Sequence, residues 1–136
     1  MDRIILTPLK QIFHPKGDIY HAMKKSDAGF FGFGEAYFST VLAGEIKGWK
    51  KHTAMTLNLV VPAGEIEFVV YDGKEFRVIS LSQNNYQRLT IPPEYWVAFK
   101  GIGEETNLLL NLASIEHNPS EAVNVELQEI DYGWKA

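Results

Sequence analysis

The sequence is 136 residues long, 46% hydrophobic and 22% charged, with 13 basic and 17 acidic residues and a net charge of -4. A chain of this length buries a core of its own, so we expect one domain over residues 1–136. The acidic balance argues against a nucleic-acid partner. Because the sequence contains no cysteine, it excludes disulfides, thiolate nucleophiles and cysteine-ligated metal sites, as is common in a reducing cytoplasm.

The N-terminal segment is charged from its first residues and has no continuous apolar run, which argues against a signal peptide. Nowhere does the sequence reach the roughly 20 apolar residues that a membrane span needs. We therefore expect a soluble, cytoplasmic protein with no membrane partner.

Short runs of β-branched and aromatic residues, broken by Gly, Pro, Asn and Asp, recur along almost the whole chain. They predict an all-β fold of two packed antiparallel sheets, such as a jelly roll. A single weak helical pattern covers residues 120–127, with Ser120 as its N-cap. The strands are predicted at residues 4–6, 12–13, 19–23, 30–34, 36–41, 45–52, 57–61, 66–71, 76–81, 87–91, 96–100 and 107–113.

The strand over residues 107–113 has an unusual alternation. Asn107, Leu109 and Asn111 share one face, and three leucines share the other. The asparagine face either lines a polar cavity between the sheets or is an exposed strand face. Periodicity alone leaves both interpretations open.

The only clustered chemistry of the chain lies between Gly44 and Gly64. Strand alternation places Lys50 and His52 on one face of this segment, so an imidazole and an ammonium are neighbours. The other face then carries Lys47, Trp49 and Lys51.

The spacing of these glycines resembles the first cupin motif, in which two histidines and a glutamate ligate a metal. Lys50 stands at the first histidine position, His52 at the second and Leu57 at the glutamate position. In the second cupin motif, laid on residues 86–101, Val97 stands at the histidine position. One imidazole cannot hold a divalent ion that requires three or more protein ligands, so we expect no metal and no cofactor.

Several further segments are similar to metal-free cupins, namely the dTDP-4-dehydrorhamnose 3,5-epimerases and the dTDP-sugar 3,4-ketoisomerases. The resemblance covers most of the chain and implies a cupin-type double-stranded β-helix and a homodimer that exchanges N-terminal strands. It also implies a nucleotide-sugar substrate in surface-polysaccharide biosynthesis. The segments that carry it are residues 44–50, 64–72, 91–99, 117–119 and 129–134.

The chain departs from both groups at their catalytic positions. The epimerase base is a histidine where this chain has Lys50, and the epimerase acid is a tyrosine near His117. The ketoisomerases carry a His-x-His pair, and His52 falls on its second histidine. The match is therefore closer to the ketoisomerases.

Both reactions remove a proton beside a sugar ketone, so they need a neutral base and a group that stabilises the enolate oxygen. His52 is the candidate base and Lys50 the candidate enolate stabiliser, because a nearby ammonium disfavours the imidazolium. His117 is the candidate that returns the proton. The alternative is that Lys50 is a solvated strand residue and His52 a hydrogen-bonded histidine at the rim.

Two negative charges of a diphosphate require cations, and Lys47 stands at the position of the family's phosphate-binding arginine. Trp49 is a candidate for stacking on a base or sugar. The other candidate cations are Lys16, Arg77 and Arg88.

We therefore predict a metal-independent isomerase or epimerase of a nucleotide-linked 4-keto-6-deoxysugar. The alternative is a catalytically inactive cupin that binds a sugar or nucleotide sugar, because the family's base and acid positions are changed. A metal-dependent cupin enzyme is a third possibility that the missing ligands disfavour.

Overall fold

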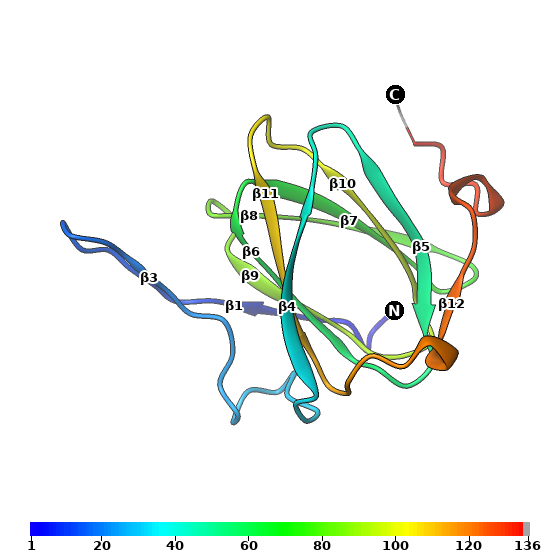
Figure 1. Ribbon diagram of the computed structural model, residues 1–136, viewed down its shortest axis with the longest axis horizontal. Coiled ribbons are helices and arrows are strands. Elements are labelled where there is room, and N and C mark those ends of the chain that lie inside the picture. The colour runs from blue at the N-terminus through cyan, green and yellow to red at the C-terminus, as the bar shows by residue number, and fades with distance from the viewer. Residues whose placement is uncertain (135–136) are drawn as a thin grey trace.

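The computed structural model describes residues 1–134, which form two facing five-stranded sheets and a projecting two-stranded hairpin (Figure 1). All pairings between these strands are antiparallel, which confirms the predicted jelly roll of two packed sheets. The first sheet contains, in order across it, β1 (Ile5–Pro8), β9 (Gln87–Ile91), β6 (Leu57–Ala63), β11 (Asn107–Ala113) and β4 (Glu35–Val41). The second contains β12 (Ala122–Asn124), β5 (Ile46–His52), β10 (Trp96–Gly101), β7 (Glu65–Tyr71) and β8 (Phe76–Ser82).

The main hydrophobic core fills the space between the two sheets. Strand β7 shows why the sequence folds this way: Ile66, Phe68 and Val70 alternate with residues of the opposite face and are fully buried. Burial of each such side chain stabilises the fold by about 1.5–3 kcal/mol. The core therefore follows directly from the period-two pattern in the sequence.

The C-terminal segment covers the outer face of the second sheet. Trp49 is buried there, its backbone N–H and C=O both pair with Val125 at 3.2 Å, and its indole N–H donates to the Leu127 carbonyl at 3.1 Å. This layer also buries Val69, which lies on the outward face of β7. Strand β7 is consequently buried on both faces.

The predicted helix over residues 120–127 is wrong. The chain forms a 3₁₀ turn at Pro119–Glu121, strand β12, and a second 3₁₀ turn at Leu127–Glu129. The backbone of β12 pairs with β5, so its polar groups are not available to a helix. No helix within residues 1–134 is long and apolar enough to cross a membrane.

The predicted strand over residues 30–34 is also wrong, since this glycine-rich segment is irregular. Gly32 has a φ of 101°, which side chains rarely adopt. Gly34 passes so close to Ile115 that a Cβ would lie 2.0 Å from its carbonyl carbon. The glycines here permit a close crossing of two chain segments.

Strand β5 contains a β-bulge opposite β10. On one side of it Lys47 lies opposite Phe99, and on the other side Lys50 lies opposite Val97. Strand β10 has only Ala98 between these pairs, whereas β5 has two residues. The extra residue reverses the alternation within β5.

The bulge requires a glycine and changes which side chains share a face. A Cβ on Gly48 would lie 2.4 Å from the Cβ of Ala98, well inside contact distance. Because Phe99 and Val97 point to the same side of β10, their partners Lys47 and Lys50 also share one side. The expectation that Lys47 shares a face with Trp49 is therefore wrong.

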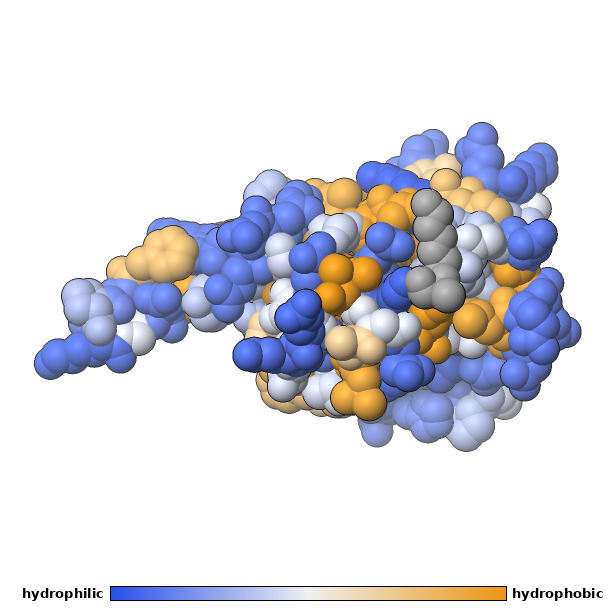
Figure 2. Space-filling view, turned by 90° about the horizontal axis from the view of Figure 1, so that it is seen from above, coloured by the Kyte–Doolittle hydropathy of each residue, from blue (hydrophilic) through white to orange (hydrophobic). Residues whose placement is uncertain are grey.

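The hairpin of β2 (Gln11–Ile12) and β3 (Ile19–Tyr20) extends away from the two sheets (Figures 1 and 2). Its apolar side chains are exposed: Ile12 by 37%, Phe13 by 71% and Ile19 by 56%. Figure 2 shows an apolar patch on this projection among hydrophilic neighbours.

Candidate functional site

A cavity of about 320 Å³ lies between the two sheets, bounded by strands β4, β5, β6, β10, β11 and β12. Its mouth lies beside β4 and β5, where Tyr37, Lys47 and Lys50 are exposed. The apolar wall consists of Leu57, Leu59, Val97, Phe99 and Leu109. The polar side chains around it are Tyr37, Ser39, Lys47, Lys50, His52, Asn111 and Asn124.

The asparagine face of β11 points into the molecule. Leu109 and Asn111 line the cavity and are buried. Asn107 is fully buried and serves the fold: its amide oxygen accepts from the Glu65 N–H at 2.9 Å, and its nitrogen donates to the Val41 carbonyl at 3.1 Å. Of the two interpretations of this strand, the cavity wall is confirmed.

His52 ends strand β5 at the cavity wall and is only 8% exposed. Its Nδ1 forms a hydrogen bond with the carboxylate of Glu121, which is also buried. Because Nδ1 is engaged in this way, Nε2 is the ring nitrogen that remains for proton exchange. A histidine with one nitrogen fixed by a carboxylate is suited to act as a base.

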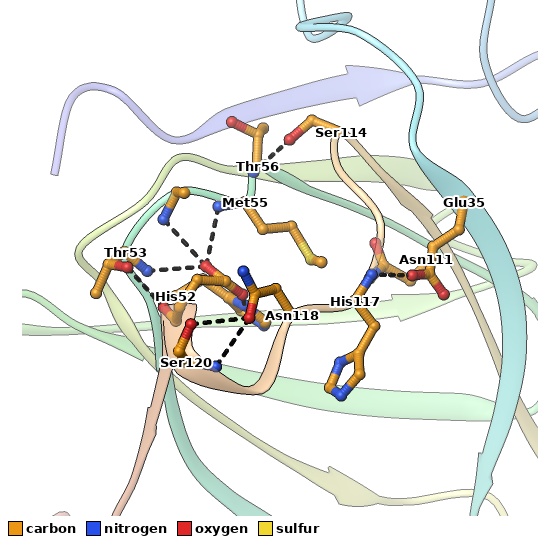
Figure 3. Close-up of polar contacts among 12 residues, drawn as sticks. Glu35, His52, Thr53, Met55, Thr56, Asn111, Ser114, His117, Asn118 and Ser120 are labelled. Carbon is orange, nitrogen blue, oxygen red and sulfur yellow. Dashed lines mark hydrogen bonds and ion pairs between the residues drawn. The ribbon is translucent and has the colours of Figure 1, made fainter.

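The carboxylate of Glu121 accepts several hydrogen bonds besides the one from His52. Its second oxygen accepts the backbone N–H groups of Thr53, Ala54 and Met55 at 3.1, 3.0 and 3.2 Å. Figure 3 shows the nitrogens of Thr53 and Met55 pointing at the same oxygen beside His52. Burial alone would raise the pKa of Glu121, but the hydrogen bonds from His52, Ala54 and Met55 outweigh it, so this pKa lies below its ordinary value.

Two predicted lysines, Lys47 and Lys50, line the same cavity as His52 and lie at its mouth. Lys50 lines the cavity on the same face as His52, as strand alternation predicts. Lys47 joins them because of the bulge, and its Nζ donates to the backbone carbonyl of Thr40 at 2.6 Å. Lys47 thus connects β5 to β4 across the mouth.

Trp49 and Lys51 lie on the outer face of β5. Trp49 borders the cavity, but its indole packs outside it, 6.2 Å from the rings of both Phe76 and Trp134. Lys51 lies 5.1 Å from the ring centre of Trp96 and pairs with a surface glutamate. Because Lys51 lies on the outer face of β5, its neighbours Lys50 and His52 lie on the inner face, as strand alternation predicts.

The other four predicted residues do not line the cavity. Lys16 is exposed in the projecting hairpin, and Arg77 lies on β8, where it donates to the Met1 carbonyl. His117 is exposed, and its backbone N–H donates to the Glu35 carboxylate.

Arg88 is fully buried in the first sheet. Its guanidinium donates to Asn58 Oδ1 at 3.0 Å, to the Ala22 carbonyl at 2.9 Å and to the Asp27 carboxylate at 3.0 Å. These bonds join the segment before β4 to the sheet, so the donors of Arg88 are used within the fold.

Glu121 is a residue of the candidate site that the sequence alone does not single out. It lies 69 positions from His52, and the chain has 17 acidic residues among which nothing local distinguishes it. The one local feature of the sequence here is Asn118–Pro119, which indicates a turn just before Glu121. Asn118 caps this 3₁₀ turn by accepting the Ser120 N–H at 3.1 Å. Within residues 1–134, no three His, Cys, Asp or Glu side chains group closely enough to hold a metal ion.

Comparison with known proteins identifies a family and several similar structures. The family model described as FdtA: WxcM-like, C-terminal matches residues 3–128. Agl13 of Haloferax volcanii, a probable low-salt glycan biosynthesis epimerase, is 28% identical over 113 residues, which cover 74% of this chain and 72% of Agl13. A dTDP sugar isomerase from Desulfovibrio desulfuricans G20 is 32% identical, with a TM-score of 0.89 over 93% of this chain and 86% of that chain.

A second similar structure is QdtA from Thermoanaerobacterium thermosaccharolyticum, a sugar 3,4-ketoisomerase in complex with TDP. It is 22% identical, with a TM-score of 0.77 over 88% of this chain and 86% of QdtA, a likeness of fold. The expected cupin-type double-stranded β-helix and the resemblance to sugar isomerases and epimerases are confirmed.

Because the pKa of Glu121 is lowered in the folded chain, the free energy of unfolding should depend on pH. A carboxyl whose pKa is lower in the folded chain stabilises the fold above its unfolded pKa of about 4.3, and this stabilisation is lost as the pH falls through the folded pKa. We expect E121Q to unfold at lower urea than the wild type at pH 7, with a loss of about 1–3 kcal/mol that shrinks in acid. E116Q, at an exposed glutamate of the same segment, is the control. An E121Q deficit that does not change with pH would contradict the interpretation.

Proposed function

The chain belongs to the WxcM-like, C-terminal family, and from this premise we propose that it is a metal-independent isomerase or epimerase of a nucleotide-linked 4-keto-6-deoxysugar in surface-polysaccharide biosynthesis. One observation carries the proposal: a histidine fixed by a buried carboxylate faces a cavity that also holds two lysines. The match to a dTDP sugar isomerase and to a glycan biosynthesis epimerase supports the substrate class.

In the proposed reaction His52 is the base. Its Nε2 takes the proton from the carbon beside the ketone, the electron pair of that C–H bond forms the enolate double bond, and the carbonyl oxygen becomes the oxyanion. The ammonium of Lys50 stabilises this oxyanion, and Glu121 stabilises the imidazolium and keeps its ring in place. Protonation of a carbon of the enolate then completes the turnover.

Of the two reactions, ketoisomerisation fits the site better. Moving a carbonyl between adjacent carbons requires one base that takes a proton from one carbon and returns it to the next. Epimerisation requires a proton donor on the opposite face of the sugar from the base. Among the described residues His52 is the one imidazole on the cavity wall, while His117 lies outside it.

The nucleotide diphosphate would bind at the mouth, beside Lys47. The ammonium of Lys47 attracts its negative charges, while that of Lys50 stabilises the oxyanion of the sugar. Lys47 binds as a point charge because it lacks the two-pronged geometry of an arginine. The apolar wall formed by Val97, Phe99 and the leucines would take the deoxysugar and its methyl group.

A homodimer is part of the proposal. The β2–β3 hairpin extends from the sheets with exposed apolar side chains, and β4 is an edge strand whose Phe38 is 64% exposed. Such surfaces are stabilised when a second copy covers them.

A second candidate function is binding without turnover. It is favoured by Lys50, which stands at the position where the epimerases carry their histidine base. Incubation with dTDP-linked and other nucleotide-linked 4-keto-6-deoxysugars in deuterated water separates the two candidates. Binding with neither deuterium at C3, C4 or C5 nor formation of a 3-keto or epimerised product would establish the binding function instead.

Replacement of His52 tests the proposed base. We expect H52N to lose at least about 100-fold in turnover and in deuterium incorporation, because the enolate no longer forms. H21N is the matched control, since His21 does not line the cavity. Turnover of H52N equal to that of the wild type would refute the assignment.

Replacement of Lys47 tests the phosphate site. We expect K47A to raise the Kd for dTDP about tenfold, which corresponds to about 1.4 kcal/mol, and to reduce the salt dependence of binding measured by calorimetry. K51A is the control on the opposite face of the same strand. Equal losses of affinity in K47A and K51A would show that the cavity mouth is not the phosphate site.

The dimer is tested by light scattering at micromolar concentration. We expect the mass of two chains for the wild type and a shift toward one chain for F13D, which places a charge on the exposed apolar hairpin. A monomeric wild type would contradict the dimer without affecting the proposed chemistry.

A further inference from the structure

Ser39 is a hydroxyl-bearing side chain of the cavity to which the proposed reaction gives no role. Resting on the proposed function, we infer that Ser39 binds the C2 hydroxyl of the sugar and so selects 2-hydroxy sugars over 2-deoxy sugars. On a 4-keto-6-deoxyhexose this is the one hydroxyl that takes no part in moving the carbonyl from C4 to C3. C1 carries the diphosphate, C5 carries the ring oxygen, and C6 is a methyl group.

The position of Ser39 follows from the sheet register. Ser39 on β4 lies directly opposite Leu109 on β11, and both line the cavity. Leu109 is buried and belongs to the apolar wall. Because side chains alternate along a strand, the next residue, Thr40, points to the opposite side and is exposed. Ser39 therefore places a hydroxyl beside an apolar part of the cavity.

The hydroxyl of Ser39 is not used within the fold. Among residues 1–134 it forms no hydrogen bond, whereas the neighbouring hydroxyl of Tyr37 accepts from Asn111 at 3.1 Å. The one buried side-chain polar atom without a partner in this part of the chain belongs to Trp134, so the Ser39 oxygen borders the open space of the cavity. It can both donate to and accept from a ligand.

A bound sugar either pairs with this hydroxyl or leaves it unpaired. A ligand that fills the cavity displaces water from the wall, and a hydroxyl that then has no partner weakens binding. A C2 hydroxyl supplies the partner, whereas a 2-deoxy sugar presents only a CH₂ group. A site that bonds a ligand hydroxyl in this way discriminates against the analogue that lacks it.

The place of Ser39 relative to Lys47 selects C2 of the sugar. Lys47, at which we place the diphosphate, donates to the backbone carbonyl of Thr40 at 2.6 Å, and Thr40 is the residue next to Ser39. The diphosphate is attached to C1, and C2 is the neighbouring carbon of the ring. The reacting carbons C3 and C4 lie toward His52, at the far end of β5 from Lys47.

The other polar side chains around the cavity fit the C2 hydroxyl less well. Asn124 on β12 lies opposite Lys50, which stabilises the enolate oxygen in the proposed reaction, so Asn124 lies near the reacting end of the sugar. Asn111 already bonds the hydroxyl of Tyr37. Ser39 combines an unused hydroxyl with a position beside the diphosphate site.

A thermodynamic cycle measured by calorimetry tests the inference. It uses two unreactive ligands that differ only at C2, dTDP-6-deoxyglucose and dTDP-2,6-dideoxyglucose. We expect the wild type to bind the 2-hydroxy ligand about tenfold more tightly, and S39A to bind both ligands within about twofold of each other. S39T keeps the hydroxyl and should retain the preference. S82A, at the end of β8 and outside the cavity, is the matched control and should also retain it.

The outcomes separate this inference from the proposed function. A preference that is unchanged in S39A would overturn the inference, and so would a wild type that does not distinguish the two ligands. Neither result affects the proposed function, because turnover of the 4-keto sugar is measured separately. A wild type that binds neither ligand would contradict both. Binding with the expected preference but without turnover would contradict the isomerase and support the role of Ser39.

Discussion

One buried carboxylate, that of Glu121, connects the parts of the chain on which the site depends. It accepts three consecutive backbone N–H groups after β5 and holds the imidazole of His52. Removing a carboxylate from water costs several kcal/mol unless donors replace the water, and here four donors do so. The same contacts fix the His52 ring and attach the segment before β12 to the end of β5. The orientation of the His52 ring and the path of the C-terminal segment are therefore set by a single group.

The β-bulge in β5 is the second constraint. It allows Lys47 and Lys50 to point to the same side of a strand in which simple alternation would separate them. Two cations at the mouth and an apolar wall behind them suit a ligand with a charged end and an uncharged deoxysugar. Gly48 permits this arrangement because its missing side chain leaves room for Ala98.

The departures from the related enzymes have a coherent physical meaning. The ammonium of Lys50 is a hydrogen-bond donor only, whereas an imidazole can also accept, and it can stabilise negative charge on oxygen. In the proposed reaction one imidazole transfers the proton between carbons, which is compatible with a ketoisomerase and less so with an epimerase. Tyr37 and Asn111 form a hydrogen-bonded pair on the opposite wall, from a strand pair outside the cupin motifs.

Much of the fold could be predicted from the sequence, because hydrophobic alternation is a local property of an extended backbone. Strands β9 and β11 begin and end at the predicted residues, and Lys50 and His52 share a face as expected. For the asparagine face of β11 the sequence allows two positions, a cavity wall or an exposed face. Only burial between the sheets decided that it lines a cavity.

Other parts of the site depend on contacts between segments far apart in the sequence. The bulge that turns Lys47 inward arises from pairing with β10, and the packing of Trp49 depends on a tail that reaches it across the outer face. Glu121 acquires its role because a segment 69 positions away folds against His52. By itself the sequence determined the strands and the chemistry available on them. The tertiary structure decided which of those groups meet, because partners are chosen by strand pairing and burial rather than by local pattern.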